Sequence, residues 1–129
     1  DNDLKEKIHF LGYRTDIEAI LAKYDLVFHS SITPDSLPTV IFEAIKMRVP
    51  VAATELAGAV EILDNGNCGL LVPLNNAKKT AELINDYIKD KKLKMSNIEK
   101  AIEYTNQHFS PTQFEKNILD IFKNTFTSK

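Results

Sequence analysis

The sequence predicts an α/β fold: a parallel sheet of about four short strands with flanking helices and a helical C-terminus. Short apolar runs alternate with helical patterns as far as Pro73. These runs show no polar alternation, which is typical of strands in a sheet that is covered on both faces. From Asn76 onward only helical periodicity remains. Strands that alternate with helices form parallel sheets with right-handed crossovers.

The predicted strands are bounded by glycine, proline or polar turns. They cover residues 8–11, 26–29, 51–54 and 69–72. Gly12 closes the first strand, Pro50 leads into the third, and Pro73 ends the fourth. Because open parallel sheets bind ligands beyond the carboxyl ends of their strands, a site is expected in the loops that follow these four runs.

The predicted helices begin at recognisable caps. They cover residues 15–24, 38–47, about 60–63, 76–89, 96–108 and a last helix from 111. Thr15 and Glu18 have capping-box spacing, and so do Ser110 and Gln113. Pro38 suits a first helical turn, where its lack of an N–H removes no helical hydrogen bond.

Apolar stripes predict the inward faces of three helices. They are Ile17, Ile20 and Leu21 in the first, Ala77, Ala81, Leu83, Ile84 and Ile88 in the fourth, and Phe114, Ile118, Ile121 and Phe122 in the last. The charge run 89–94 is predicted to be a solvated connection between helices.

Composition excludes several function classes. The chain has 129 residues, 43% hydrophobic and 26% charged, which fits one globular domain with one core. The formal net charge of −2 provides no basic field for nucleic acid. The single cysteine, Cys68, excludes an intramolecular disulfide and is expected in the core. No apolar run approaches the ~20 residues that span a bilayer, and the polar start is unlike a signal peptide, so we expect a cytoplasmic protein.

The loop of residues 30–37 contains the richest set of polar groups. It ends at a helix N-terminus, whose free N–H groups and positive dipole end favour a phosphate. Glu43 is the only acid in the apolar helix behind it, and a carboxylate there is costly unless something hydrogen-bonds it. Glu43 lies about 7.5 Å along the axis from Pro38, roughly the distance from a diphosphate to the ribose of the same nucleotide. Asp35 lies just before the tip. Alternatively, Asp35 could cap the helix and Glu43 could pair with Lys46.

The stretch at 35–44, Asp-Ser-Leu-Pro-Thr-Val-Ile-Phe-Glu-Ala, resembles the E-x7-E motif of the group 1 retaining glycosyltransferases of GT-B fold. Blocks at 10–12, 24–28, 50–54, 58–62 and 66–73 resemble the same family in the same order, and the similarity covers about residues 8–120. The resemblance implies a Rossmann-like sheet. It also implies that residues 1–129 form a single, incomplete nucleotide-sugar-binding domain, the C-terminal part of a longer enzyme truncated at its N-terminus.

The resemblance implies that the whole enzyme transfers a sugar from a nucleotide-diphosphate sugar to an acceptor hydroxyl with retention, as a hexosyltransferase of polysaccharide biosynthesis. The implied catalytic acids are Asp35, facing the hydroxyls of the donor sugar, and Glu43, facing the ribose. Implied donor-binding residues are Tyr13 and Arg14 near the base, and Ser36, Leu37, Thr39 and Val40 near the diphosphate. No metal or other cofactor is expected.

Three features depart from the family pattern. Asp35 stands where glutamate is commoner, which shortens its reach by about 1.5 Å. Ser36-Leu37-Pro38 replaces Gly-Phe-Gly, which tightens the approach to the phosphates. The family's basic residues that neutralise the diphosphate, its first two strands and its acceptor domain belong before residue 1. The chain alone is therefore expected to be inactive and to bind nucleotide weakly or not at all, so submicromolar binding of a nucleotide sugar by calorimetry would contradict this expectation.

Without those two strands, the strands at 8–11 and 26–29 must either pair directly or leave open edges that favour self-association. The expected partners are a nucleotide sugar and the acceptor domain, and peripheral membrane association of the whole enzyme stays open. Two alternatives also stay open: a nucleotide-sugar epimerase of similar fold, and a non-catalytic α/β binding module. The D-x-D spelling at residues 1–3 and the acid Glu61, which we expect to begin a short helix, are not assigned to the site.

Overall fold

The centre of the fold is a parallel three-stranded sheet in the order β1-β2-β3. The computed structural model describes residues 4–126. Its elements are α1 (Ile17–Leu21), β1 (Val27–His29), α2 (Thr39–Lys46), β2 (Val51–Thr54), α3 (Ala57–Ile62), η2 (Asp64–Gly66), β3 (Leu70–Val72), α4 (Ala77–Lys89), α5 (Lys91–His108) and α6 (Pro111–Phe126). Val27 pairs with Val51, and Thr54 with Val72, so the three carboxyl ends lie at one edge. The predicted α/β class and parallel sheet are confirmed.

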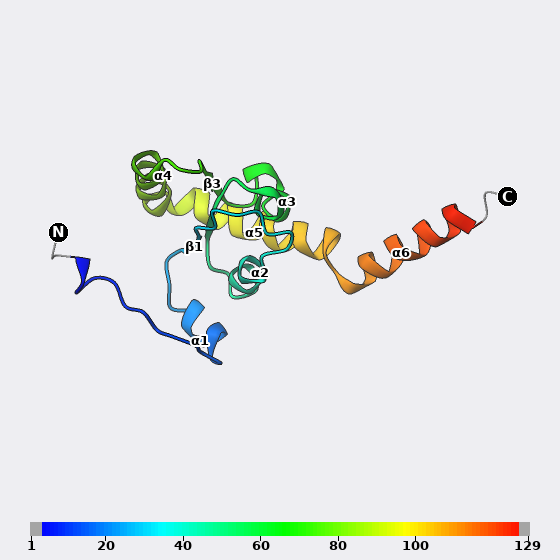
Figure 1. The fold of residues 1–129 in the computed structure, drawn as a ribbon, viewed down its shortest axis with the longest axis horizontal. Helices are drawn as coiled ribbons and strands as arrows, with labels where there is room; N and C mark the ends of the chain where they lie inside the picture. The colour runs from blue at the N-terminus through cyan, green and yellow to red at the C-terminus, as the bar shows by residue number, and fades with distance from the viewer. Residues whose placement is uncertain (1–3, 127–129) are drawn as a thin grey trace.

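The predicted strand at residues 8–11 does not form. This run takes no regular structure, and Phe10 in its middle is 96% exposed. Figure 1 shows the N-terminal segment running away from the sheet before it reaches α1. A strand needs a hydrogen-bonding neighbour, and no described strand lies beside this run. The sheet therefore has three strands where the sequence predicted about four, and β1 and β3 are its edges.

The core forms around β2, the central strand, all four of whose residues are buried. Ala52 and Ala53 have small side chains that let helices approach both faces closely. α2 packs on β1 and β2, α4 packs on β3, and the long α5 contacts both α2 and α4. The largest fully buried side chains are Ile41, Ile62, Leu63 and Val72. At about 25 cal/mol per Å² of apolar surface removed from water, burial of such side chains is the main force that holds the layers together.

Helix α1 is shorter than predicted, and its capping box is absent. Asp16 is the N-cap residue, but its side chain caps no helical N–H. The two acids at the start of α1 have other partners: Asp16 pairs with Arg14, and Glu18 accepts from Lys46 of α2 at 2.6 Å. Tertiary ion pairing thus replaces the local cap between Thr15 and Glu18, and the helix ends at Leu21.

The charge run at 89–94 is not a connection, because only Asp90 separates α4 from α5. Its Oδ1 accepts from the Leu93 N–H at 2.9 Å, so it caps a helix that begins five residues earlier than predicted. The inward stripe of α4 is also different. Ala77 and Ala81 are exposed, while Tyr87, which is absent from the predicted stripe, is 4% exposed and is the buried residue of this helix.

Helix α6 begins as predicted but does not bury its apolar stripe. Ser110 Oγ accepts from the Gln113 N–H at 3.2 Å, which confirms the cap. Phe114 is nevertheless 67% exposed and Ile121 61% exposed. Figure 1 shows why: α6 extends from the end of α5 away from the sheet. The sequence showed that this helix has an apolar face, but most of that face stays exposed to solvent.

Two smaller expectations also change. α3 begins at Ala57, so Glu61 lies in its last turn and cannot act as an N-terminal cap. The D-x-D spelling at residues 1–3 lies outside the described residues. Among residues 4–126, none of the helices combines the length and the apolar character needed to span a bilayer.

Candidate functional site

The loop between β1 and α2 lies at the carboxyl edge of the sheet and is fastened from β2 and α3. Thr54, the last residue of β2, has its Oγ1 2.6 Å from the Ser31 carbonyl and 3.1 Å from the His29 carbonyl. Further along the loop, the Gly58 N–H donates to the Asp35 carbonyl at 3.1 Å. The loop is therefore held near both its start and its end.

Asp35 caps the turn before α2 rather than the helix itself. Its Oδ1 accepts from the Leu37 N–H at 3.1 Å, and the carboxylate is exposed. The N-cap of α2 is Pro38, which provides no side-chain cap. The N–H groups of Thr39 and Val40 have no acceptor inside the helix, since the first turn of any α-helix lacks one. The tip of α2 thus presents backbone donors together with the positive end of the helix dipole.

Glu43 lies in the middle of α2 and is half-buried. It lines a hollow of about 440 Å³ together with residues 15–19 at the start of α1. Within the described part of the chain its carboxylate forms no hydrogen bond or ion pair. The alternative pairing with Lys46 is absent, because Lys46 pairs with Glu18 instead. A half-buried carboxylate without a partner is unfavourable, so this group is well placed to accept hydrogen bonds from a ligand.

The predicted base-binding pair, Tyr13 and Arg14, lies just before this hollow in sequence. Tyr13 is 94% exposed. The Arg14 guanidinium donates two hydrogen bonds to the Asp16 carboxylate, at 2.8 and 2.6 Å. These hydrogen bonds and the opposite charges raise the pKa of Arg14, and the hydrogen bonds from Arg14 are the main reason that the pKa of Asp16 is lowered. Asp16 lines the same hollow as Glu43, so Arg14 is tied to the hollow through Asp16, while neither Tyr13 nor Arg14 lines it.

The remaining predicted residues flank Pro38, the buried N-cap residue of α2. Ser36, Leu37 and Thr39 are exposed, and Val40 is half-buried. The Leu37 N–H was predicted to lie near the diphosphate, but in the structure it donates to Asp35. Along the chain Asp35 precedes the tip and Glu43 follows it, and Asp35 does not line the hollow that Glu43 lines.

Sequence reasoning missed a larger hollow at the same edge of the sheet. It has a volume of about 620 Å³ and is lined mainly by apolar residues, including Phe28 of β1, Pro73 after β3, and Ala77 and Ile84 of α4. Thr54 also lines it. The signal in the sequence was the set of loops after the strands, which predicted the edge but not the cavity.

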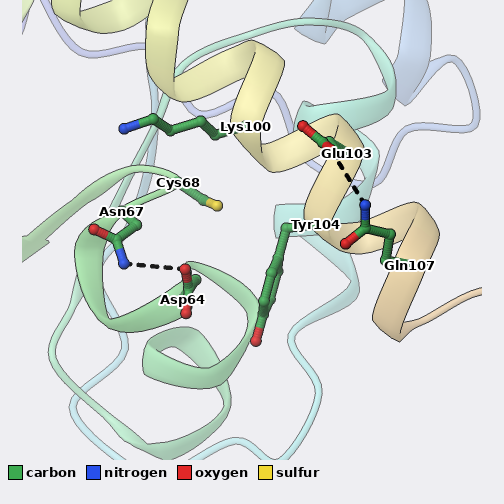
Figure 2. A pocket seen from close by; sticks show the side chains of 7 residues that line it. All are labelled: Asp64, Asn67, Cys68, Lys100, Glu103, Tyr104 and Gln107. Carbon is green, nitrogen blue, oxygen red and sulfur yellow. Dashed lines mark hydrogen bonds between the residues drawn. The ribbon is translucent and has the colours of Figure 1, made fainter.

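A polar hollow of about 290 Å³ lies at the opposite edge, where the chain enters β3. Figure 2 shows its lining: Asp64, Asn67, Cys68, Lys100, Glu103, Tyr104 and Gln107. Cys68 is 3% exposed, and burial is the main reason that the pKa of its thiol is raised. A raised pKa disfavours the reactive thiolate, which agrees with the predicted core position of Cys68.

A parallel α/β sheet whose carboxyl edge presents a helix tip and a ligand-sized hollow belongs to the class of α/β folds that bind ligands at that edge. Residues 1–104 match the family model described as "Glycosyl transferases group 1". The chain belongs to this family.

Curated relatives agree with this assignment. The chain is 25% identical over 130 residues to N-acetyl-alpha-D-glucosaminyl L-malate synthase of Bacillus anthracis, a match that covers 98% of this chain and 34% of that protein. It is 26% identical over 110 residues to the lipopolysaccharide glucosyltransferase WaaG of Escherichia coli K12, covering 85% of this chain and 28% of that protein. The chain therefore spans about a third of the length of these relatives.

The fold resembles that of a solved structure with bound nucleotide. HepE of Anabaena in complex with UDP superposes with a TM-score of 0.82 at 30% identity, over 95% of this chain and 34% of that one. The same protein in complex with UDP-glucose gives a TM-score of 0.81. The GT-B type of fold that the resemblance implied is confirmed, with three strands in place of about four.

Proposed function

We propose that this chain is the nucleotide-sugar-binding part of a glycosyltransferase. The whole protein would transfer a sugar, of hexose type, from a nucleotide-diphosphate sugar to an acceptor hydroxyl with retention at the anomeric carbon. The observation that supports the proposal most directly is the half-buried carboxylate of Glu43, which has no partner among the described residues and lines a hollow beside α1. UDP and UDP-glucose complexes of a protein with the same fold are consistent with it.

The diphosphate would bind at the tip of α2. The N–H groups of Thr39 and Val40 point outward from the first helical turn, and the dipole adds favourable potential for an anion. Pro38 has no N–H to donate. These donors would also stabilise the charge that develops on the diphosphate as the glycosidic bond breaks. The role of this strip is therefore to hold the leaving group and lower its energy.

Glu43 would accept hydrogen bonds from the ribose hydroxyls in the hollow that it shares with residues 15–19. Two such bonds would relieve the cost of leaving the carboxylate half-buried and unpartnered. Asp35 would face the hydroxyls of the donor sugar. Since its Oδ1 accepts from Leu37, its Oδ2 is the oxygen available for that contact. The two acids would thus fix the donor at both ends, and positioning supplies much of the catalysis. The proposal includes no metal.

The test is a donor screen on the whole enzyme with Asp35→Ala and Glu43→Ala, with Glu115→Ala as control. Glu115 is an exposed acid on α6 that lines neither of the hollows at the carboxyl edge of the sheet. We expect each site variant to reduce transfer by about tenfold or more, as for loss of one or two charge-assisted hydrogen bonds, and the control to leave it unchanged. Full transfer by both site variants would refute the site assignment.

A further inference from the structure

The loop that leads to the tip of α2 is held by one short segment, from the end of β2 to the start of α3. We infer that Thr54 and Gly58, the two ends of this segment, are positioning residues for the proposed donor site. They fix the backbone that carries Asp35 without needing to contact the donor themselves. The inference rests on the proposed function, and it adds two residues that neither the motif nor the hollow beside α1 contains.

Thr54 controls the direction in which the chain leaves β1. Its side chain is buried, and its place is fixed by pairing with Val72 of β3. Its hydroxyl donates to the Ser31 carbonyl at 2.6 Å, with the His29 carbonyl as a second acceptor at 3.1 Å. Without this hydroxyl, two carbonyl groups at the start of the loop lose a buried donor. The start of the loop therefore needs the hydroxyl group itself, and a side chain of the same shape without a hydroxyl cannot replace it.

Gly58 controls the end of the same loop by close approach. A Cβ at this position would lie 2.3 Å from the Asp35 carbonyl oxygen and 2.5 Å from that of Ser36. Both are backbone atoms, so no side-chain rotation can relieve the overlap. The φ angle of Gly58 is not in the left-handed region, so the need for glycine here is spatial rather than conformational. The Gly58 N–H also donates to the Asp35 carbonyl at 3.1 Å.

Displacement of this loop would change the site, because the two acids are carried differently. Glu43 is fixed in the middle of α2, next to the fully buried Ala44. Asp35 is carried by the loop, and its carboxylate is tied to Leu37. A shift of the 35–36 backbone would move Asp35 relative to both Glu43 and the N–H groups of the tip. The spacing between the acids thus depends on Gly58, and the path of the loop toward them depends on Thr54.

The first arm of the test needs no nucleotide. Amide ¹H–¹⁵N spectra are recorded for the chain and for Thr54→Val, Thr54→Ser, Gly58→Ala and Gly69→Ala. Thr54→Val keeps the shape and removes the hydroxyl, and Thr54→Ser restores it. Gly69→Ala is the matched control: its Cβ would lie 2.9 Å from the Val51 carbonyl oxygen, at the far edge of the sheet. We expect Thr54→Val and Gly58→Ala to shift the amide signals of residues 31–37, and Thr54→Ser and Gly69→Ala to leave them in place.

The second arm titrates the same proteins with UDP and follows the amide signals of Thr39 and Val40. We expect Thr54→Val and Gly58→Ala to weaken UDP binding about five- to tenfold, as for loss of one hydrogen bond that orders the loop, with Thr54→Ser within about twofold of the unaltered chain.

Unchanged loop signals in both variants would overturn the inference, and so would displaced loop signals with unchanged affinity. If the unaltered chain shows no response to UDP, as weak binding by the chain alone would allow, the first arm decides the inference and the donor screen on the whole enzyme decides the proposed function. Because Thr54→Val is nearly isosteric, it keeps the test valid even if Gly58→Ala does not fold.

Discussion

Some polar side chains in this protein have no hydrogen-bond or ion-pair partner among the described residues. Glu43 and Tyr87 are two such residues. The Glu43 carboxylate is half-buried and unpaired within the described residues, and the Tyr87 hydroxyl is buried with no hydrogen-bond partner. The first borders a hollow, which fits a ligand-binding role. The second lies in the packed layer around α4, where we assign it no such role.

Replacement of Glu43 should separate stability from binding. We expect Glu43→Gln to leave the melting temperature of the ligand-free chain unchanged or to raise it slightly, because it removes an unpartnered charge from a half-buried position. The same variant should bind UDP more weakly, since an amide accepts hydrogen bonds less strongly than a carboxylate. Calorimetric melting and NMR titration of the same samples would check this. A clear fall in melting temperature would indicate that Glu43 has a structural partner instead.

Tyr87 should make the fold sensitive to alkali. Burial raises the pKa of its phenol from 10.0 to about 12. The folded state therefore keeps the proton more tightly than the unfolded state between these pH values, and stability falls as pH rises from about 10 toward 12. The loss should reach about 2–3 kcal/mol if the full shift applies. Tyr87→Phe should flatten this dependence in urea denaturation series, and it should not be less stable at neutral pH, because it removes an unsatisfied hydroxyl. An unchanged alkaline slope in that variant would contradict the prediction.

At the level of elements, caps decide where the C-terminal helices begin. Asn76 accepts from the Lys79 N–H at 3.0 Å to start α4, and Asp90 accepts from the Leu93 N–H at 2.9 Å to start α5. The early start of α5 lengthens the helix that contacts both α2 and α4. The charge run at 89–94, which the sequence predicts to be a connection, therefore contains the cap and the first turn of α5.

Removal of the Asp90 cap should destabilise the chain. We expect Asp90→Ala to lower the free energy of unfolding by about 1 kcal/mol, the usual effect of losing an N-cap acceptor. Asp86→Ala, which removes an exposed acid from within α4, is the control and should change it by less than about 0.5 kcal/mol. Urea denaturation of both variants at neutral pH is the measurement. Equal effects of the two substitutions would mean that the cap does not stabilise α5.

For the whole molecule, the main feature is exposed apolar surface on α6 and at the edges of the sheet. β1 and β3 are the edges of the sheet, and the apolar stripe of α6 is exposed. Open strand edges and large apolar patches favour association with other chains. This agrees with the sequence-based expectation that the chain self-associates, which remains a prediction.

We expect the chain to sediment as a concentration-dependent mixture of monomer and larger species. Phe114→Glu and Ile121→Glu together should shift it toward monomer, since charges on the exposed stripe oppose apolar association. Glu115→Gln, on the same helix, should not. Sedimentation velocity over a range of concentrations would decide, and a monomer alone at the highest concentration would remove the hypothesis.

The sequence by itself determined the fold class, the three strands that form, and the starts of α2, α4 and α6 to within about one residue. It also determined the order along the chain of Asp35, the N-terminus of α2 and Glu43. These follow from local patterns: uninterrupted apolar runs, cap spacings, and the position of Pro38 before an apolar helix. The placement of Asp35 and Glu43 on either side of the helix tip follows from chain connectivity alone.

Only the tertiary structure decided how those groups are partnered. Lys46 pairs with Glu18 of α1, which lies 28 residues away in the sequence, instead of with Glu43. The fate of the run at 8–11 and the exposure of α6 were decided in the same way, by which neighbours are present in space. Periodicity reports which residues are apolar and how they are spaced, but a hydrogen bond, an ion pair or a buried face needs a second surface, and that surface comes from elsewhere in the chain.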